Sequence, residues 1–288
     1  MALAPGTALF STVGSPAGDQ LATWCPAAGR VLRRNLMRER ARLDEDPIRI
    51  VIDVGSFDGT DAISFATASQ QRVWTFEPTP SKHDGIRRRL NEAGVAGNVT
   101  LFPFALSNKT GDGQLEVLRA AKPKGRKFMN NQLGSAQDLL TQDVRPGQLP
   151  TTRAGVVKVP IRQLDQVVAD HAPPLARVAF MKVDAQGFDT LVLRGASRLL
   201  SERRIEKFVF EFTPFLMPGR ENEAVAGLMW LERLGHLCVP CNQAHTTAVK
   251  LRAPASIVDY VEYFRGKNDK YDDIACRPAG GTRRVRRR

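Results

Sequence analysis

The sequence predicts an α/β fold built on a mostly parallel sheet with helices on both faces. Apolar runs suited to buried strands alternate with runs suited to helices along most of the 288 residues. The stretch Ile48–Thr60 joins β-branched residues to a turn bracketed by two glycines and a helix-compatible run. Acids end several expected strands, and the carboxyl ends of parallel strands meet at one edge, where such folds bind ligands. These acids are Asp53, Glu77, Asp184 and Glu211.

Apolar periodicity and turn residues define the elements of the first half. Pro80 suits the start of the second helix, because its missing N–H needs no partner there. A turn cluster at Asn108–Gly113 precedes a short strand that pairs locally. The expected elements are a strand at Ile48–Asp53, a helix at Asp61–Ser69, a strand at Val73–Phe76, a helix at Ser81–Asn91, and strands at Val99–Leu106 and Gln114–Arg119.

Between Ala120 and Ala154 the periodicity fades. Segments of this length without regular structure are usually functional or disordered in a compact domain. The segment contains polar residues, Asn130 to Ser135, that suit either ligand contacts or ordinary turns. We expect it to contact the substrate.

The second half continues the alternation, and Gly235 stops its last clear helix. The end of the chain should contain the strand that closes the sheet, around Ile274–Cys276. The elements before it are a strand at Val156–Ile161, a helix at Leu164–Ala169, a strand at Val178–Val183, a helix at Leu191–Leu200, a strand at Phe208–Phe212, a helix at Glu223–Leu234 and a strand at Leu237–Val239.

Composition changes divide the chain into an N-terminal extension at residues 1–45, a domain at 46–279 and a basic tail at 280–288. The extension is rich in Ala, Gly and Pro, and its run Val31–Leu43 could form an amphipathic helix that covers the sheet. It lacks a signal-peptide core, and no apolar run approaches the roughly 20 residues that cross a bilayer. We therefore expect a soluble protein in the cytoplasm, with an organelle transit peptide left open.

The net charge of +12 is concentrated in two segments, the five arginines of the tail and a loop at Lys122–Lys127. Both could bind nucleic acid, and both could be ordinary solvated segments. The four cysteines suggest no disulfide framework. Cys238 and Cys241 form a lone C-x-x-C without further ligands at zinc-finger spacing, so we expect no metal site.

The glycine turn itself indicates the cofactor. A dinucleotide site uses Gly-x-Gly-x-x-Gly, whereas this turn has Gly-x-x-x-Gly with Asp53 and Asp58 in or beside it. Carboxylates repel a pyrophosphate but suit a ligand with an ammonium and a sulfonium group. Glu77 ends the next strand, about 20 residues further on, where an acid binds both ribose hydroxyls. The two features together predict a site for S-adenosylmethionine.

Several motifs in fixed order resemble the FkbM family of methyltransferases. They are Val51–Thr60, Phe76-Glu77-Pro78, Ala105-Leu106-Ser107, Leu164-Asp165, Met181–Asp189 and Leu193–Ala196. The resemblance covers residues 48 to 276 and implies the seven-stranded, Rossmann-like class I fold, S-adenosylmethionine as methyl donor, and a hydroxyl on a sugar, glycan or small molecule as acceptor. The cofactor-binding positions it implies are Asp53, Gly55, Ser56, Phe57, Asp58, Gly59, Glu77, Pro78, Ala105 and Asp184. This chain departs from the family at Gln186, where the family often has Glu.

Asp184 and Glu211 are the catalytic candidates, because they end neighbouring strands that face one crevice. An alcohol must lose its proton when it attacks a methyl group, and a nearby carboxylate can accept that proton. Asp184 could instead cap the next helix or bind the amino group of the cofactor. Among the histidines, only His245 lies in a loop that could reach the acceptor.

Two other functions remain open at this stage. Lys182, Asp184, Lys207 and Glu211 resemble the lysine–acid–lysine–acid set of RNA ribose 2′-O-methyltransferases, and the chain is basic. Alternatively, a non-catalytic protein that keeps the methyltransferase fold could bind nucleic acid through its tail and loop. Strong dependence of RNA binding on salt and on the tail would favour the nucleic-acid alternatives.

Overall fold

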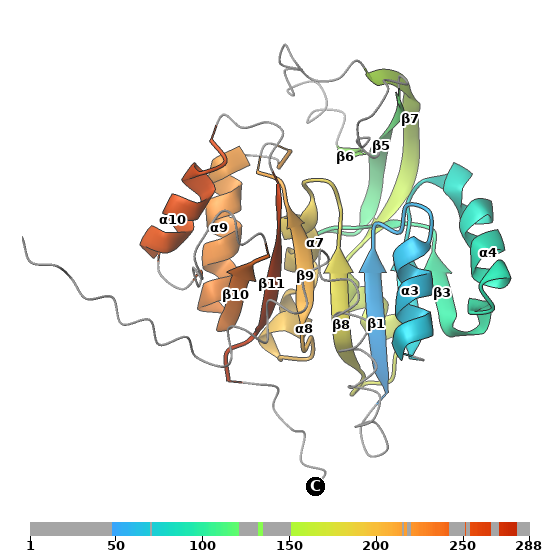
Figure 1. The fold of residues 1–288 in the computed structure, drawn as a ribbon, viewed down its shortest axis with the longest axis horizontal. Coiled ribbons are helices and arrows are strands. Elements are labelled where there is room, and N and C mark those ends of the chain that lie inside the picture. The colour runs from blue at the N-terminus through green and yellow to red at the C-terminus, as the bar shows by residue number, and fades with distance from the viewer. Residues whose placement is uncertain are drawn as a thin grey trace, which may run out of the picture.

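The computed structural model describes residues 48–69, 71–120, 132–134, 151–214, 216–217, 220–241, 251, 254–265 and 271–280. A seven-stranded sheet with helices on both faces forms the body, and a smaller sheet stands above its upper edge (Figure 1). This confirms the α/β fold with a mostly parallel sheet that the sequence predicts.

The seven strands follow the order β10-β11-β9-β8-β1-β2-β3, and β11 is antiparallel to both of its neighbours. The order reverses at β1, between β2 and β8, so ligands are expected at the carboxyl end of β1. The strands span Arg49–Val54 (β1), Arg72–Phe76 (β2), Val99–Phe102 (β3), Arg177–Val183 (β8), Phe208–Phe212 (β9), His236–Pro240 (β10) and Asp272–Pro278 (β11).

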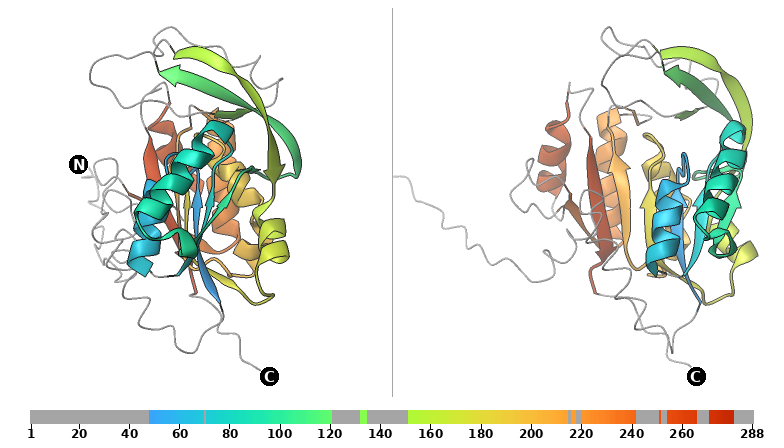
Figure 2. Two further views of the ribbon diagram at one scale, coloured as in Figure 1. Left: turned by 90° about the vertical axis from the view of Figure 1, so that its right-hand side faces the viewer. Right: turned by 45° about the vertical axis from the view of Figure 1, so that its right-hand side comes forward.

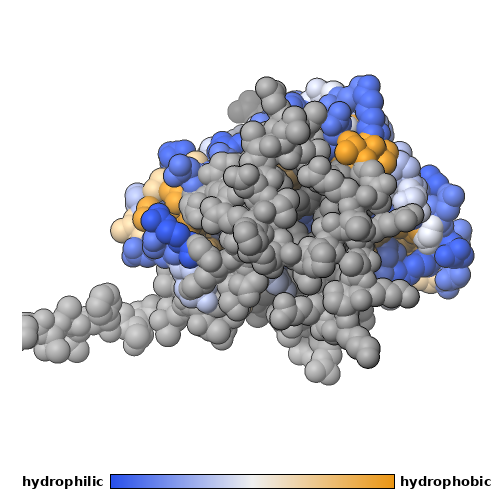
Figure 3. Space-filling view, turned by 90° about the horizontal axis from the view of Figure 1, so that it is seen from above, coloured by the Kyte–Doolittle hydropathy of each residue, from blue (hydrophilic) through white to orange (hydrophobic). Residues whose placement is uncertain are grey.

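Alternate residues of the central strands enter two apolar clusters on opposite faces of the sheet. Helices α3 and α4 cover one face, where Val51 packs with Phe65 and Ile86. Helices α6 to α10 pack on the other face, which contains Ile50 and Ile52. Seen from above, the coloured flanks of the molecule are mainly hydrophilic (Figure 3). The helices span Thr60–Ser69 (α3), His83–Glu92 (α4), Leu164–His171 (α6), Asp189–Arg194 (α7), Ser197–Ser201 (α8), Arg220–Arg233 (α9) and Pro254–Glu262 (α10).

The second sheet is dominated by a long antiparallel pair that rises from the upper edge of the body (Figure 2). At its base, an apolar cluster joins Leu115, Val159 and Ile161 to Phe188, which follows β8. The base of the pair is therefore fixed against the carboxyl end of the main sheet. Its strands, in the order β4-β7-β5-β6, span Ala105–Leu106 (β4), Gly111–Ala120 (β5), Gln132–Gly134 (β6) and Thr151–Arg162 (β7).

The structure corrects several element boundaries. The expected strand at Val99–Leu106 is two strands in different sheets, with Pro103, which has no N–H to donate, between them. The expected helix at Leu191–Leu200 is two helices separated at Gly195. A Cβ on Gly195 would lie 2.1 Å from the carbonyl oxygen of Ser107, so the close contact there requires glycine. Helix α10 was not expected.

The expectation that the cysteines form no disulfide is wrong. Cys238 of β10 and Cys276 of β11 lie opposite each other in the antiparallel register and form a disulfide. Cys241 is disulfide-bonded as well. Disulfides persist mainly in oxidising compartments, and the cytoplasm expected from the sequence stays a prediction.

Several expectations fall outside the described residues and stay predictions. They concern the N-terminal extension with its helix at Val31–Leu43, the basic loop Lys122–Lys127, His245 and the arginine tail. Among the residues that are described, no helix is long and apolar enough to span a membrane.

Candidate functional site

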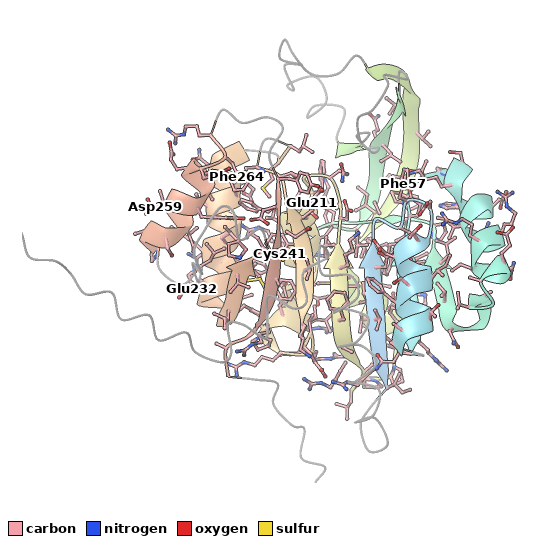
Figure 4. The ribbon with its side chains drawn as sticks, in the orientation of Figure 1. Phe57, Glu211, Glu232, Cys241, Asp259 and Phe264 are labelled. Atoms are coloured by element: carbon pink, nitrogen blue, oxygen red, sulfur yellow. A yellow bond between two sulfur atoms is a disulfide. The ribbon has the colours of Figure 1, made fainter. Side chains whose placement is uncertain are left out.

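An open pocket lies at the carboxyl end of the main sheet, next to the reversal of strand order, and its empty space, open solvent included, is about 590 Å³. The turns after β1 and β2, the strands β4 and β5, and the loop after β8 line it. Phe57 and Glu211 both lie at this upper edge (Figure 4).

Gly55 makes the floor of the pocket by bringing two strand ends together. Its φ is +84°, and an added Cβ would lie 1.9 Å from the carbonyl oxygen of Asp184. The backbone N–H groups of Gly55 and Ser56 both donate to the carbonyl of Phe76, at 3.0 and 3.1 Å. The turn is thereby tied to β2, and a side chain at residue 55 has no room.

Glu77 is buried and held by two backbone donors. The N–H of Phe57 donates to one carboxylate oxygen at 2.8 Å, and the N–H of Thr79 donates to the other at 2.9 Å. Each oxygen keeps a second acceptor site for a ligand. The backbone of Phe57 has φ +55°, an uncommon conformation for a residue with a side chain, which aims its N–H at Glu77.

Phe57 and Lys82 form one wall of the pocket. The ammonium of Lys82 lies 3.8 Å from the centre of the Phe57 ring, and the ring is 47% exposed. Burial lowers the pKa of Lys82, against the opposing effects of Glu77 and Asp58. Phe104 and Leu115 supply apolar surface on another side.

Asp53 lies on the same face of the sheet as Lys182, its neighbour in the register of β1 and β8. It is fully buried and accepts a hydrogen bond from the Thr75 hydroxyl at 2.7 Å, while its Oδ1 has no partner among the described residues. Burial raises the pKa of Asp53 to about 6, and Lys182 acts in the opposite direction. Lys182 forms ion pairs with Asp61 at 2.6 Å and Asp184 at 3.2 Å. Burial acts to lower the pKa of Lys182, but the neighbouring carboxylates together raise it overall.

The loop after β8 is pinned by Asp189. Its carboxylate accepts the N–H groups of Ala185 and Gly187, both at 3.0 Å, while its complete burial raises its pKa to about 8. A Cβ on Gly187 would lie 2.6 Å from Leu216. The loop therefore has little freedom, and it presents the side chain of Gln186 to the pocket.

Gln186 joins the two catalytic candidates. Its amide nitrogen donates to Asp184 at 2.7 Å and to Glu211 at 3.0 Å. Burial, followed by the charges of Asp184, Asp189 and Asp273, raises the pKa of Glu211 to about 9. Asp273 of β11 lies opposite Glu211 in the register, and burial raises its pKa to about 7.

Asp58 lies outside the lining of the pocket. Its carboxylate accepts the Thr60 N–H at 3.0 Å and forms an ion pair with Arg89 of α4. Burial acts to raise its pKa, but the bonds to Thr60 and the charge of Arg89 lower it overall. Asp58 thus accepts the N–H of the first residue of α3 and ties that helix to α4.

The predicted site residues divide into two groups. Those that line the pocket are Gly55, Phe57, Glu77, Pro78, Ala105 and Asp184. Those outside its lining are Asp53, Ser56, Asp58, Gly59 and Glu211. Sequence reasoning missed Thr79, Lys82, Phe104, Leu115 and Phe188, which also line it. The sequence marks Gln186 only as a departure from the FkbM family. No local pattern predicts that its side chain bridges the carboxyl groups of Asp184 and Glu211.

The four residues that resemble an RNA-methylating set do not converge. Lys182 pairs with Asp184, but Lys207 precedes β9 while Glu211 lies near its other end. Four residues of extended strand separate their backbones by roughly 13 Å. The observed geometry does not favour this set.

Comparison with known proteins identifies one family. The model of the methyltransferase FkbM domain matches residues 53–238, more than half of the chain. No curated protein matches the chain significantly.

Several solved structures are similar to this chain at low sequence identity. Cofactor-bound Rv0187 from MTB is 14% identical, with coverage of 93% of this chain and 92% of that chain and a TM-score of 0.42. The O-methyltransferase TomG from Streptomyces achromogenes, in complex with SAM, is 16% identical, with coverage of 93% and 82% and a TM-score of 0.37. An rRNA methylase from Streptococcus thermophilus is 10% identical, with coverage of 93% and 99% and a TM-score of 0.40. Similarity at this level carries no information about substrate.

Proposed function

The chain belongs to the family of methyltransferase FkbM domains, and from that premise we propose that it methylates a hydroxyl oxygen of a sugar, glycan or other small molecule. It is an S-adenosylmethionine-dependent methyltransferase. The observation that carries the oxygen-directed proposal is the Asp184 carboxylate in the wall of the pocket, beside the amide of Gln186.

The residues that line the pocket, and Asp53 directly before it in β1, fit the cofactor in three respects. The fixed oxygens of Glu77 can each accept one more hydrogen bond, as two ribose hydroxyls require. Gly55 lines the pocket with bare backbone, because a Cβ there would clash with the carbonyl of Asp184. The fully buried Oδ1 of Asp53 has no partner among the described residues, and a buried carboxylate suits a nearby positive charge.

We assign these residues separate parts in binding. Glu77 would hold the ribose, while Phe57 and Phe104 provide apolar surface for the adenine ring. Gly55 and Asp184 would lie beside the amino-acid end of the cofactor. Asp58 supports the turn indirectly, through the start of α3.

When bound, the cofactor supplies a methyl group activated by the sulfonium. The chain contributes by holding the acceptor hydroxyl in line with that methyl group, which can account for much of the rate enhancement. Asp184 would accept the hydroxyl proton. Lys182 and Gln186 bond to different oxygens of Asp184 and fix its orientation.

An Asp184→Asn variant tests the proton-accepting role. We expect the turnover of an acceptor found by screening to fall about 100-fold or more, with S-adenosylhomocysteine affinity within about threefold of wild type. Asp84→Asn, a change at a 99% exposed side chain of α4, is the control for a lost charge. Near-normal turnover by Asp184→Asn would contradict the role, and a large loss of affinity would instead assign Asp184 to the amino group of the cofactor.

A further inference from the structure

One face of the main sheet is buried farther along than the described helices on that face account for. Helices α3 and α4 pack there over β1, β2 and β3 (Figure 1), and Phe65 of α3 reaches Phe180 of β8. The same face continues through β9, β11 and β10, and its apolar side chains there are buried as well. A further segment of the chain therefore covers these three strands. The buried apolar residues are Val209, Ala275, Leu237 and Val239.

Cys241 can anchor that segment. It directly follows β10, its N–H donates to the carbonyl of Asp273 at 2.7 Å, and its side chain packs with the same apolar cluster. It is disulfide-bonded. The chain has four cysteines, and two of them, Cys238 and Cys276, bond to each other. Cys25 is therefore the one cysteine of this chain that is left to pair with Cys241.

The N-terminal extension has an apolar pattern that suits this face. Within the run Val31–Leu43, the side chains of Leu32, Leu36 and Leu43 fall within about 40° of one another on a helix, at about 100° per residue. Glu39 lies between the last two of them, and arginines are the commonest residues on the other sides. A helix over this run would therefore carry an apolar stripe to pack on the sheet.

The dimensions of the sheet also suit this helix. Since β11 is antiparallel to both of its neighbours, β10 runs parallel to β1, and Cys241 lies at the carboxyl edge. A helix over Val31–Leu43 would be roughly 20 Å long, and the six-residue strand β1 is also roughly 20 Å long. Such a helix leads from residue 25 at the carboxyl edge to Arg49, which begins β1 at the opposite edge. The sideways distance between β9 and β1 is roughly 10 Å, which the chain between Leu43 and Arg49 can span.

Two other segments that adjoin β10 and β11 suit the face less well. Residues 242–250 are mainly polar, and they lead to Leu251, which packs in the apolar cluster on the opposite face of the sheet. Residues 281–288 consist largely of arginines and carry no apolar stripe. The apolar pattern and the remaining cysteine both favour the N-terminal extension.

We propose that the N-terminal extension covers β9, β11 and β10 on the side of α3, with the leucines of a helix at Val31–Leu43 against the sheet, and that a Cys25–Cys241 disulfide fixes it there. The bond forms by thiol–disulfide exchange. The two thiols lose two protons and two electrons, which reduce glutathione disulfide to two thiols. The tether holds residue 25 at the edge of the sheet that carries the pocket, so the extension is part of the folded domain.

Disulfide mapping of the full chain tests the tether without a variant. The protein is equilibrated with reduced and oxidised glutathione, its free thiols are alkylated, and an unreduced tryptic digest is analysed by mass spectrometry. Trypsin leaves Cys238 and Cys241 in one peptide, so that peptide is fragmented between them, before Pro240. Cys25 should be bonded to the fragment that contains Cys241. Alkylated Cys25, a bond from Cys25 to another cysteine, or a Cys241 bond between two copies of the chain would overturn the tether.

A matched pair of substitutions tests which side of the helix faces the sheet. Leu36→Ala should lower the melting temperature by at least about 4 °C and speed amide exchange in β10 and β11, because it removes a side chain that packs on them. Arg34→Ala is the control, since it lies about 200° around the helix from Leu36, and it should shift the melting temperature by less than about 1 °C. Equal shifts in the two variants, or unchanged exchange in β10 and β11, would overturn the proposed packing.

Discussion

Gly55 and Asp184 approach so closely that a Cβ on the glycine would lie 1.9 Å from the carbonyl oxygen of the aspartate. The contact joins the ends of β1 and β8, and the N–H of Asp184 donates to the carbonyl of Val54 at 2.9 Å beside it. The geometry of the pocket floor therefore depends on a residue without a side chain.

Gly55→Ala should lower the free energy of unfolding by roughly 3 kcal/mol, because it adds both a clash and a side chain at φ +84°. It should also weaken binding of S-adenosylhomocysteine. Gly97→Ala is the matched control, since a Cβ there meets nothing within 4 Å. Denaturant unfolding measures the stability, and calorimetry measures the affinity for S-adenosylhomocysteine. Equal stability of Gly55→Ala and Gly97→Ala would refute the close contact between Gly55 and Asp184.

Asp58 tests whether a residue outside the pocket supports the turn without contacting the cofactor. Asp58→Ala removes the hydrogen bond to the Thr60 N–H and should cost about 1 kcal/mol of stability. Affinity for S-adenosylhomocysteine should change less than about threefold, because the carboxylate faces Arg89 of α4. Loss of binding with unchanged stability would restore the direct cofactor role that the sequence suggests for Asp58.

The free energy of unfolding should fall as the pH rises, because the folded protein buries carboxyl groups in their uncharged form. The folded pKa of Glu211, about 9, and that of Asp189, about 8, exceed the ordinary values of 4.5 and 3.8. The folded state therefore binds more protons than the unfolded state between about pH 4 and 9. The stability that these protonated carboxyl groups contribute is fully present below about pH 4 and is lost as the pH rises to about 8 to 9.

Glu211→Gln mimics the protonated side chain and should remove part of this dependence. Between pH 5.5 and 8.5, the free energy of unfolding should fall less steeply than in wild type, by about 1 kcal/mol for each pH unit. Asp84→Asn should keep the full wild-type slope, because that side chain is 99% exposed. A wild-type slope in Glu211→Gln would show that Glu211 is ionised in the folded protein at neutral pH.

The Cys238–Cys276 disulfide should stabilise the sheet by restricting the unfolded chain. The two cysteines are 38 residues apart, so the double variant Cys238→Ala/Cys276→Ala should lose about 2 to 4 kcal/mol of stability. Mass spectrometry of an unreduced digest identifies the bridge directly. Free thiols at both positions in protein purified without reductant would contradict it.

The sequence predicts most of the main sheet because a buried strand carries a continuous apolar run, as in Val178–Met181 of β8. It also predicts Gly55, Glu77 and Asp184 in the site, because their positions follow from the ends of parallel strands. Local patterns do not reveal the break at Pro103 between two sheets or the full length of β7, since strand extent depends on the partner strand.

The contacts that sequence reasoning missed depend on distances between remote segments. Gln186 meets Glu211 only because β8 and β9 are neighbours, and Cys238 meets Cys276 only through the register of an antiparallel pair. The sequence places Asp58 in the glycine turn and so suggests a cofactor role, which stays a prediction, whereas its ion pair with Arg89 follows only from the position of α4. Proximity in sequence could not distinguish these alternatives.

Calorimetric titration with S-adenosylmethionine and S-adenosylhomocysteine tests the central claim most directly. Wild type should bind both with micromolar affinity, about −8 kcal/mol, and Glu77→Ala should lose at least about 1.4 kcal/mol of this. Glu92→Ala, at a surface residue of α4, should bind like wild type. Folded wild-type protein that binds neither ligand would contradict a methyltransferase function, and undiminished binding by Glu77→Ala would contradict the site described around Glu77.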